Sequence, residues 1–401
     1  MAWVAIPNSP DWEYDNAATV ADTYTDANGT TASGIRTFTP TGGSVQLTYI
    51  KVRRVGDTAD TSRGELSKSF WDARGTEDDL QPFNMTVRTT AANEAFTIPC
   101  QNYGTFNATI DWGDGSSSTV TTYNDSNLAH TYASAGDHAI SISGTFPNIK
   151  FGNDSVAAEK VIAVTNLGQV GWQMLERAFK NCDNMTSFTS GVTDTSSVTN
   201  MYEIFYACND MTSCDASGFN TSNVTNMGGM FRYNYDLTSL DISSFDTSSV
   251  TNMYGTFWSC QSLTSLDVSN FNTSLVRSMF YMFINCQSLT SLDVSNFDTS
   301  SVTNMNGMFF GGSSLTDIVG IENFNIEGID NTIWLSNFMN SVTLPTARYD
   351  ALLVNWDAQD PLDNLVPNFG SSQYTAGGAA EAARANLIST DGWTITDGGA
   401  A

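Results

Sequence analysis

The chain has 401 residues, a formal net charge of −26 at pH 7, 41% hydrophobic residues and 14% charged residues. This acidity excludes the basic footprint that nucleic acid needs, and it opposes docking on an anionic membrane. No stretch approaches the roughly 18–20 apolar residues of a membrane span, so membrane insertion is not expected. The length and apolar fraction indicate two to four folded domains.

Residues 1–82 form the first predicted domain. Residues 45–50 alternate like a strand and continue into a basic run that contains Lys51, Arg53 and Arg54. We interpret this run either as a solvated strand face or as a docking edge for an acidic partner. The segment resembles N-terminal parts of structural proteins of marine tailed phages. That resemblance implies an anchor or assembly domain that contacts other virion proteins.

The start of the chain also bears on where the protein is made. Residues 1–37 contain one basic residue, Arg36, and no unbroken apolar run of the length that a signal peptide needs. We therefore expect synthesis in a cytoplasm without the usual export signal.

Residues 83–147 are predicted to be all-β. The motif DWGDG at 111–115 closes a strand with a tight turn, and HTY at 130–132 precedes a second turn at Gly136. These two motifs resemble those of the PKD-type, immunoglobulin-like β-sandwich. The resemblance implies a spacer or presentation module.

Asp111 and Asp114 are the metal candidates of this segment. Their carboxylates either help to hold a calcium ion or close the turn through hydrogen bonds to its backbone. His130 and His138 are the only histidines of the chain. His130 is expected to pack within the sandwich, so no histidine-based catalytic or metal site is predicted.

A repeat of 26 residues occupies 172–328, after a connector at 148–171. The phrase VTNM or its variant VRSM begins at five evenly spaced positions: Val198, Val224, Val250, Val276 and Val302. A fixed period of this length predicts stacked units that share one continuous core. Counting backwards and forwards from these positions predicts about six units.

Each unit is predicted to be a short strand followed by a short helix. Leu266 and Val268 are two residues apart, so they point to the same side of a strand. Met279, Phe283 and Cys286 then follow at i, i+4 and i+7, which is one stripe of a helix. The predicted core consists of these Met, Phe, Leu, Val and Cys columns. The cysteines are expected to form a reduced, buried ladder.

The phrases LTSLDVSNFNTS at 263–274, FINCQS at 283–288 and LTSLDVSNFDTSSVTNM at 289–305 carry a family resemblance. They are similar to the BspA-like leucine-rich repeats of bacterial surface proteins and phage-borne proteins. The resemblance implies a leucine-rich-repeat-like solenoid built on a parallel sheet. It also implies a role in adhesion or recognition, without common catalytic residues. The predicted fold is therefore multidomain and mainly β with short helices, with an immunoglobulin-like β-sandwich before the solenoid.

Columns of the repeat that do not vary are core or turns, and two columns that vary lie one residue after a core position. The varying columns are Tyr202, Gly228, Tyr254, Phe280, Asn306 and Tyr206, Arg232, Trp258, Ile284, Phe310. Exposed aromatic residues stack on sugars or anchor a protein partner. The predicted binding residues are therefore Tyr202, Tyr206, Arg232, Tyr254, Trp258, Phe280 and Phe310. The alternative is that these side chains pack between neighbouring units.

An acidic column lies on the predicted strands. It consists of Asp215, Asp241, Asp267 and Asp293. Like charges side by side on adjacent strands repel, and either calcium or solvent with serine hydroxyls relieves that repulsion. Their regular spacing indicates architecture and not the paired carboxylates of an enzyme.

Residues 329–401 are placed to cover the open end of the repeats. Two helical faces are predicted there: Tyr349, Leu352, Leu353 and Trp356, then Ala379, Ala383 and Leu387. Phrases at 372–374 and 391–399 resemble closing segments of repeat-bearing phage and bacterial surface proteins.

Three functions are weighed on these observations. The first is a non-enzymatic structural protein on the surface of a phage virion, as a tail fibre, appendage or head decoration. It would bind a host surface glycan or protein through its repeats and would assemble as a homo-oligomer. The second is a bacterial adhesin of the BspA-like type. The third is a glycan-degrading enzyme on a fibre. No cofactor is expected unless calcium is bound.

Overall fold

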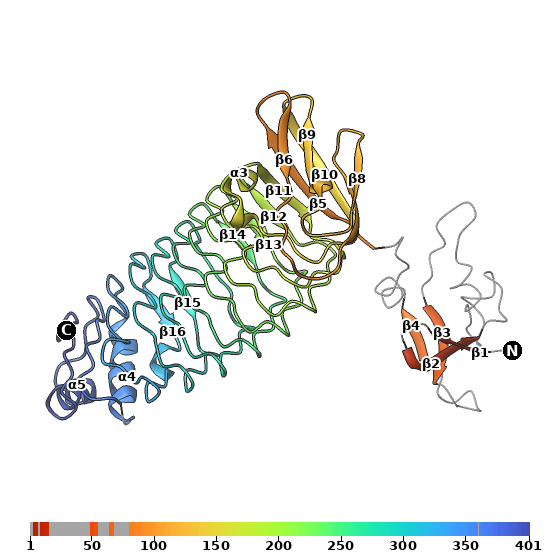
Figure 1. Cartoon of the computed structure of the whole chain (residues 1–401). Coiled ribbons are helices and arrows are strands. Elements are labelled where there is room, and N and C mark those ends of the chain that lie inside the picture. The colour runs from red at the N-terminus through yellow and green to blue at the C-terminus, as the bar shows by residue number, and fades with distance from the viewer. Residues whose placement is uncertain (1–2, 7–8, 16–48, 55–63, 68–79, 360) are drawn as a thin grey trace. The chain divides into compact units, whose positions relative to one another are not determined.

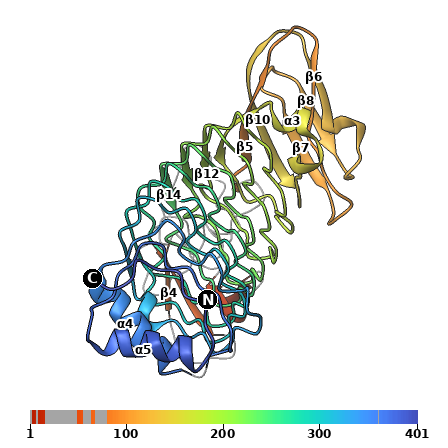
Figure 2. The same ribbon diagram turned by 90° about the vertical axis from the view of Figure 1, so that its left-hand side faces the viewer.

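In the computed structural model, the described residues are 3–6, 9–15, 49–54, 64–67, 80–359 and 361–401. The chain forms two compact units, Met1–Leu80 and Gln81–Ala401. The described residues are mainly strands and turns with few short helices, as the sequence predicts (Figure 1). Figure 2 shows the turns of the larger unit lying side by side along its length.

The smaller unit contains a four-stranded antiparallel sheet. Its strands are β1 (Trp3–Ile6), β2 (Ser9–Asp15), β3 (Tyr49–Arg54) and β4 (Gly64–Ser67), paired in that order. The basic run lies on β3. Among the described strands, β3 pairs with both β2 and β4, so its backbone is not an edge of this sheet. Docking of an acidic partner through the basic side chains stays a prediction. Arg53 is opposite Glu13, and Lys51 is opposite Glu65.

Residues 83–145 form strands in two sheets. β5 (Phe83–Thr89), β7 (Asn107–Asp111), β8 (Ser117–Val120) and β10 (Gly136–Thr145) belong to a mixed sheet of eight strands. β6 (Glu94–Thr97) and β9 (Ala129–Tyr132) pair separately, and η3 (Ser126–Leu128) precedes β9. Trp112 and Tyr132 are fully buried, and the Tyr132 hydroxyl donates to the Trp112 carbonyl at 3.0 Å.

Residues 148–171 join this sheet to the repeats. They contain η4 (Phe151–Asn153), α3 (Ser155–Ala158) and β11 (Val161–Asn166). β11 is antiparallel to β5 and parallel to the first repeat strand, β12 (Ser187–Thr189), so one sheet runs through both regions. The predicted connector therefore carries a strand of that sheet.

The repeat strands recur in register. β13 (Ser213–Asp215) and β14 (Ser239–Asp241) follow β12, and β15 (Ser291–Asp293) pairs with β16 (Asp317–Val319). No strand is assigned at 265–267, so the predicted ladder is interrupted between β14 and β15. A second ladder continues past this gap through bridges at Asn200, Asn226, Asn252, Ser278 and Asn304.

Turns replace the predicted helix in each unit. From 172 to 320 the structure has no helical segment. Glu203 and Ala207 have φ of 55°, a left-handed conformation that ends a helix. The N–H groups of Met201, Glu203 and Phe205 instead donate to carbonyls of the next unit. Met201 and Phe205 are both fully buried, so these turns produce the same i, i+4 pattern as a helix.

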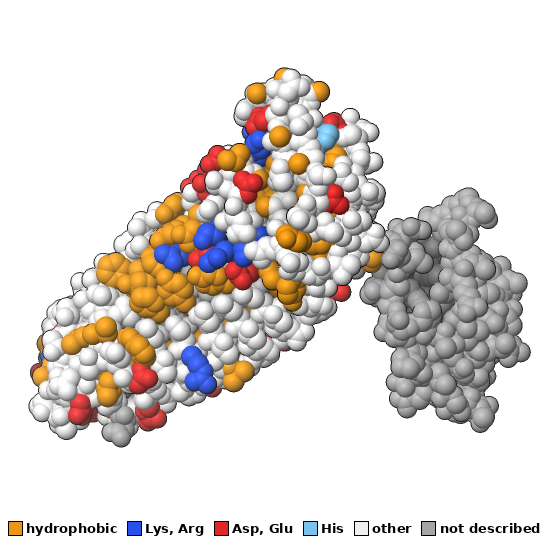
Figure 3. Space-filling view, viewed as in Figure 1, with side chains coloured by type: hydrophobic (Ala, Val, Ile, Leu, Met, Phe, Trp, Pro, Cys, Tyr) orange, Lys and Arg blue, Asp and Glu red, His pale blue; other side chains and the backbone are white. Residues whose placement is uncertain are grey.

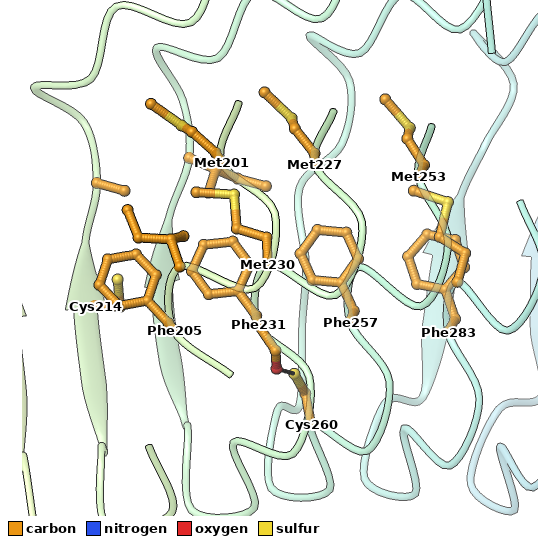
Figure 4. Close-up of a cluster of buried hydrophobic side chains, with 14 of the residues drawn as sticks. Met201, Phe205, Cys214, Met227, Met230, Phe231, Met253, Phe257, Cys260 and Phe283 are labelled. Atoms are coloured by element: carbon orange, nitrogen blue, oxygen red, sulfur yellow. Dashed lines mark hydrogen bonds between the residues drawn. The ribbon is translucent and has the colours of Figure 1, made fainter. Parts of the chain in front are cut away.

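The predicted core columns lie inside the larger unit. Phe205, Phe231, Phe257 and Phe283 stack with centroid separations of 5.5–5.8 Å and nearly parallel rings (Figure 4). The Met201, Met227 and Met253 side chains lie beside them, fully or almost fully buried. The described cysteines are free. The Cys260 Sγ donates to the Phe231 carbonyl at 3.2 Å.

The stacking continues beyond 328. The Met305 N–H donates to the Trp334 carbonyl, and the Met339 N–H donates to the Asn368 carbonyl. η5 (Ile321–Asn323) lies just before this part, and α4 (Thr346–Asp357) and α5 (Ala379–Ser389) lie within it. The predicted buried face of α4 is confirmed. In α5 the buried residues are Ala380, Ala383 and Leu387, so the prediction for Ala379 is wrong.

Candidate functional site

The described surface of the larger unit has one region where aromatic and basic side chains gather. Figure 3 shows hydrophobic side chains next to a group of Lys and Arg side chains over the repeats. We call this region the aromatic face. It comprises Tyr202, Tyr206, Arg232, Tyr233, Tyr235, Tyr254, Trp258, Phe280 and Tyr281, all half-buried except Tyr235, which is exposed.

Arg232 lies at the centre of the aromatic face. Its guanidinium carbon lies 3.5 Å from the ring centroid of Trp258 and 4.6 Å from that of Tyr233. Nη1 donates to the Tyr254 hydroxyl at 3.1 Å, and Nη2 donates to the Tyr233 hydroxyl at 2.8 Å. Burial opposes its charge, but the Tyr233 hydrogen bond and the nearby phenols raise the pKa of the guanidinium above its ordinary value. Arg232 is therefore a stable cation among rings.

The rings of successive units touch one another. Tyr206 and Tyr233 have centroids 5.3 Å apart, Tyr233 and Trp258 5.5 Å, and Trp258 and Tyr281 4.9 Å. All three pairs meet edge to face, a favourable geometry for aromatic rings. Phe280 stacks on Tyr281 at 3.7 Å. The aromatic face is therefore one continuous strip that runs across the units.

Two residues of the face have a strained backbone. Tyr233 has φ of 65° and Tyr281 has φ of 60°. A left-handed conformation costs an L-residue roughly 1–2 kcal/mol. At the position of Tyr281, other units carry glycine, including Gly255 and Gly307. Backbone strain of this kind clusters at functional sites, so a bulky aromatic side chain at a left-handed position indicates a functional role.

Basic residues lie at the end of the strip nearest the first repeat. The Lys180 ammonium lies 4.1 Å from the Tyr206 centroid, and the Arg177 guanidinium lies 5.3 Å from that of Tyr202. The buried Glu203 accepts from Lys180 at 2.6 Å and from Arg177 at 2.9 Å. Burial works against ionisation of Glu203, but these two bonds outweigh it and lower the pKa of its carboxyl.

The structure brings six of the seven predicted binding residues together. Tyr202, Tyr206, Arg232, Tyr254, Trp258 and Phe280 lie on the aromatic face. Phe310 is half-buried in the following unit, and among the described residues it has no ring partner.

Sequence reasoning missed Tyr233, Tyr235 and Tyr281. The signal was present in three further columns. Tyr233 and Tyr281 stand next to the columns considered, where other units carry Gly, Ala, Ser, Asn, Glu or Arg, and Tyr235 stands where other units carry Asn, Asp, Gln or Ser.

Asp111 and Asp114 accept hydrogen bonds from their own turn. Asp111 accepts from the Gly113 N–H at 2.9 Å, and Asp114 accepts from Ser116. These bonds from Ser116, followed by one from His130, lower the pKa of Asp114. Within the described part of the chain, no cluster of three or more His, Cys, Asp or Glu side chains is arranged to hold a metal ion.

The acidic column of the repeats has the same turn geometry. Asp241, Asp267 and Asp293 each accept from the N–H group two residues later, at 2.9–3.0 Å. Hydrogen bonds from the following serines lower the pKa of all three carboxyls. These bonds disperse part of the negative charge that neighbouring units bring together.

The stacked units identify a repeat protein, and the aromatic face distinguishes one strip of its described surface. Residues 173–267 and 262–359 match the family described as "Mycoplasma protein of unknown function, DUF285". The double match supports a surface repeat protein, and it extends beyond 328, where the backbone stacking also continues. No curated protein and no solved structure matches the chain. None of the helices in the described ranges is long and apolar enough to cross a membrane.

Proposed function

We propose that this protein is a non-enzymatic recognition protein on the surface of a phage virion. In this proposal the aromatic face binds a glycan or protein of the host surface. The observation that carries it is the continuous strip of half-buried rings around Arg232, which includes two tyrosines in a strained conformation. Aromatic residues and arginine are the residue types that most often dominate binding surfaces.

The proposal includes a finer description of the fold. We take the stacked units as a leucine-rich-repeat-like solenoid and residues 83–147 as a PKD-like, immunoglobulin-like spacer. Support for the solenoid comes from the parallel pairing of β12, β13 and β14 and from the phenylalanine stack. Support for the spacer comes from the packing of Trp112 and Tyr132 between two sheets.

The proposed location on a virion is supported by the separation of the chain into two compact units. Residues 1–80 form a compact unit with its own sheet, which suits an anchor that contacts other virion proteins, with homo-oligomeric assembly. In that role Lys51, Arg53 and Arg54 interact with an acidic partner. Calcium and nucleic acid have no part in the proposal.

A bacterial surface adhesin is the second candidate. It is favoured by one specific observation, the double match to a family whose description names a cellular organism. An adhesin would use the same aromatic face, so the two candidates differ in where the protein is displayed.

Labelling with an antibody against the repeats separates the two candidates. We expect label on intact phage particles and none on the envelope of uninfected bacteria. Label on the envelope of uninfected cells, with none on particles, would reverse the choice.

A further inference from the structure

Arg232 differs from the other basic residues of the larger unit in having no carboxylate partner. Nine Lys and Arg residues lie in Gln81–Ala401. Seven of them form ion pairs with described carboxylates: Arg88, Lys150, Lys160, Arg177, Lys180, Arg348 and Arg384. Within the part of the chain that the structure describes, the two without such a partner are Arg232 and the exposed Arg277.

The donors of Arg232 are not all used. A guanidinium has five N–H donors in a planar fork. The described hydrogen bonds are those to the Tyr254 and Tyr233 hydroxyls, and the buried Nε has no partner among the described residues. The guanidinium thus has its charge stabilised by ring faces. The buried Nε is closed to a ligand, but Nη1 and Nη2 each carry a second N–H beyond the one that donates to a tyrosine hydroxyl. Carboxylates and phosphates are the groups that such a fork binds best.

The charge around Arg232 is positive in an otherwise acidic chain. Lys180 and Arg177 lie at one end of the aromatic face and both pair with Glu203. Arg177 also lies 3.8 Å from Glu176, which pairs with Lys150 as well, so with Arg232 four cations face two carboxylates. The whole chain carries −26. A local excess of cations on such a chain attracts an anionic ligand, and the half-buried ring setting strengthens the attraction.

The shape of the strip favours a linear ligand. Tyr206, Tyr233, Trp258 and Tyr281 come from four successive units, with neighbouring centroids 4.9–5.5 Å apart. A row of rings repeated at the spacing of the units suits a polymer that is itself a repeat. Ring faces of this kind stack on the C–H faces of sugars.

We propose that the aromatic face binds an acidic polysaccharide of a cell surface. A hexuronic-acid-type carboxylate accepts hydrogen bonds from Arg232, and neighbouring sugar rings stack on the tyrosine and tryptophan side chains. This inference rests on the proposed function, because it names the ligand class of the same surface.

Binding of defined polymers to the full-length chain tests the inference. The probes are polygalacturonate, the same polymer with its carboxyl groups reduced to alcohols, and poly-glutamate as an acidic peptide. We expect polygalacturonate to bind, with an affinity that falls as salt is added. The carboxyl-reduced polymer should bind about 10- to 100-fold more weakly, the equivalent of a charge-assisted hydrogen bond worth roughly 1.5–3 kcal/mol.

Three variants accompany the wild-type chain. Arg232→Gln should lose about 10- to 100-fold in affinity for polygalacturonate. Arg232→Lys keeps the charge without the planar fork and should fall between Arg232→Gln and wild type. Arg277→Gln removes the same charge outside the aromatic face and should bind as wild type does. A thermal unfolding curve of each variant shows whether it is folded, and Arg232→Lys keeps the test decisive if Arg232→Gln is not.

Four results would overturn the inference. They are equal binding of both polysaccharides, unchanged binding by Arg232→Gln, equal binding of poly-glutamate, and no binding of polygalacturonate at all. The proposed function has its own readout, the location of the antibody label. If particles are labelled but do not bind polygalacturonate, the proposed recognition protein stands and the acidic polysaccharide is excluded as its ligand.

Discussion

At the scale of single residues, the aromatic face depends on glycines of the neighbouring units. Gly307 has φ of 59°, and a Cβ atom there would lie 2.4 Å from Cε1 of Tyr281. The glycine therefore supplies both a left-handed turn and the space in which the Tyr281 ring lies. Tyr281 belongs to one unit, and the glycine that leaves room for its ring, Gly307, belongs to the next.

We predict that Gly307→Ala destabilises the protein more than a matched glycine change. Gly377 has φ of 71°, and a Cβ atom added there would meet no neighbour within 4 Å. Gly377→Ala therefore introduces backbone strain alone, roughly 1–2 kcal/mol. Gly307→Ala also displaces the Tyr281 ring, which costs about a further 1–3 kcal/mol. Urea unfolding of both variants measures the difference. Equal losses would show that the ring does not depend on this space.

At one buried position of the repeat, either cysteine or asparagine donates a hydrogen bond to a phenylalanine carbonyl of the preceding unit, and Asn234 is the asparagine. It occupies the column of Cys182, Cys208, Cys260 and Cys286. The Asn234 Nδ2 donates to the Phe205 carbonyl at 3.0 Å, as the Cys260 Sγ donates to the Phe231 carbonyl. Its Oδ1 also accepts from the Cys208 N–H at 3.0 Å. Burial raises the pKa of the Cys286 thiol to about 12, so this ladder consists of neutral thiols.

At the scale of elements, the phenylalanine column holds consecutive units together. Phe257 is fully buried, with Phe231 at 5.8 Å and Phe283 at 5.5 Å in nearly parallel stacks. Its ring fills the space between two units.

Phe257→Ala should therefore cost about 3–5 kcal/mol of unfolding free energy, the usual effect of removing a buried phenylalanine ring. Leu275→Ala serves as the control, because Leu275 is 52% exposed in the same repeats and should change stability by less than about 0.5 kcal/mol. Chemical denaturation of the two variants measures both values. A loss below about 1 kcal/mol for Phe257→Ala would contradict the stacked core.

The contact between β6 and the segment before β11 depends on pH. An ion pair with Lys160, followed by the Thr90 N–H bond, lowers the pKa of Glu94 from 4.5 to about 2. Because the folded-state pKa is the lower one, the stabilisation is complete above pH 4.5 and is lost as the pH falls towards 2.

Melting temperatures between these pH values measure this linkage. We expect Glu94→Gln to flatten the pH dependence. Glu327→Gln should leave it unchanged, since the exposed Glu327 forms no ion pair with a described residue. Parallel curves for wild type and Glu94→Gln would refute the assignment.

At the scale of the whole molecule, the sequence predicts what repeats and little of what departs from the repeat. The period identifies the buried columns because every copy must present the same side chain to the shared core. It does not distinguish a helix from successive turns, since both bring Met201 and Phe205 to one side. The sequence period also ends at 328. The backbone hydrogen bond from Met279 reaches Asn304, 25 residues later, whereas the equivalent bond from Met305 reaches Trp334, 29 residues later, so the register changes while the backbone bonding continues.

The candidate site was predictable in the same uneven way. Trp258 and Arg232 stand out because the column to which both belong varies between units. Their contact through the guanidinium is three-dimensional and was not visible in the sequence. Tyr233 and Tyr281 lie at positions whose left-handed backbone is evident only in the structure.

Phe83 links the antiparallel strands to the repeats. Its replacement by alanine therefore tests whether the larger unit unfolds as one cooperative unit. Phe83 lies in β5, and its ring meets Trp172 at 5.4 Å and Phe179, the first ring of the repeat column, at 6.3 Å. Since β5 also pairs with β11 in the shared sheet, Phe83→Ala should destabilise both regions together by about 3–5 kcal/mol. Hydrogen exchange followed separately in β7 and β13 should then accelerate in both. Faster exchange in β7 alone would show that the antiparallel strands unfold independently of the repeats, as the sequence-based division into domains at 148–171 would require.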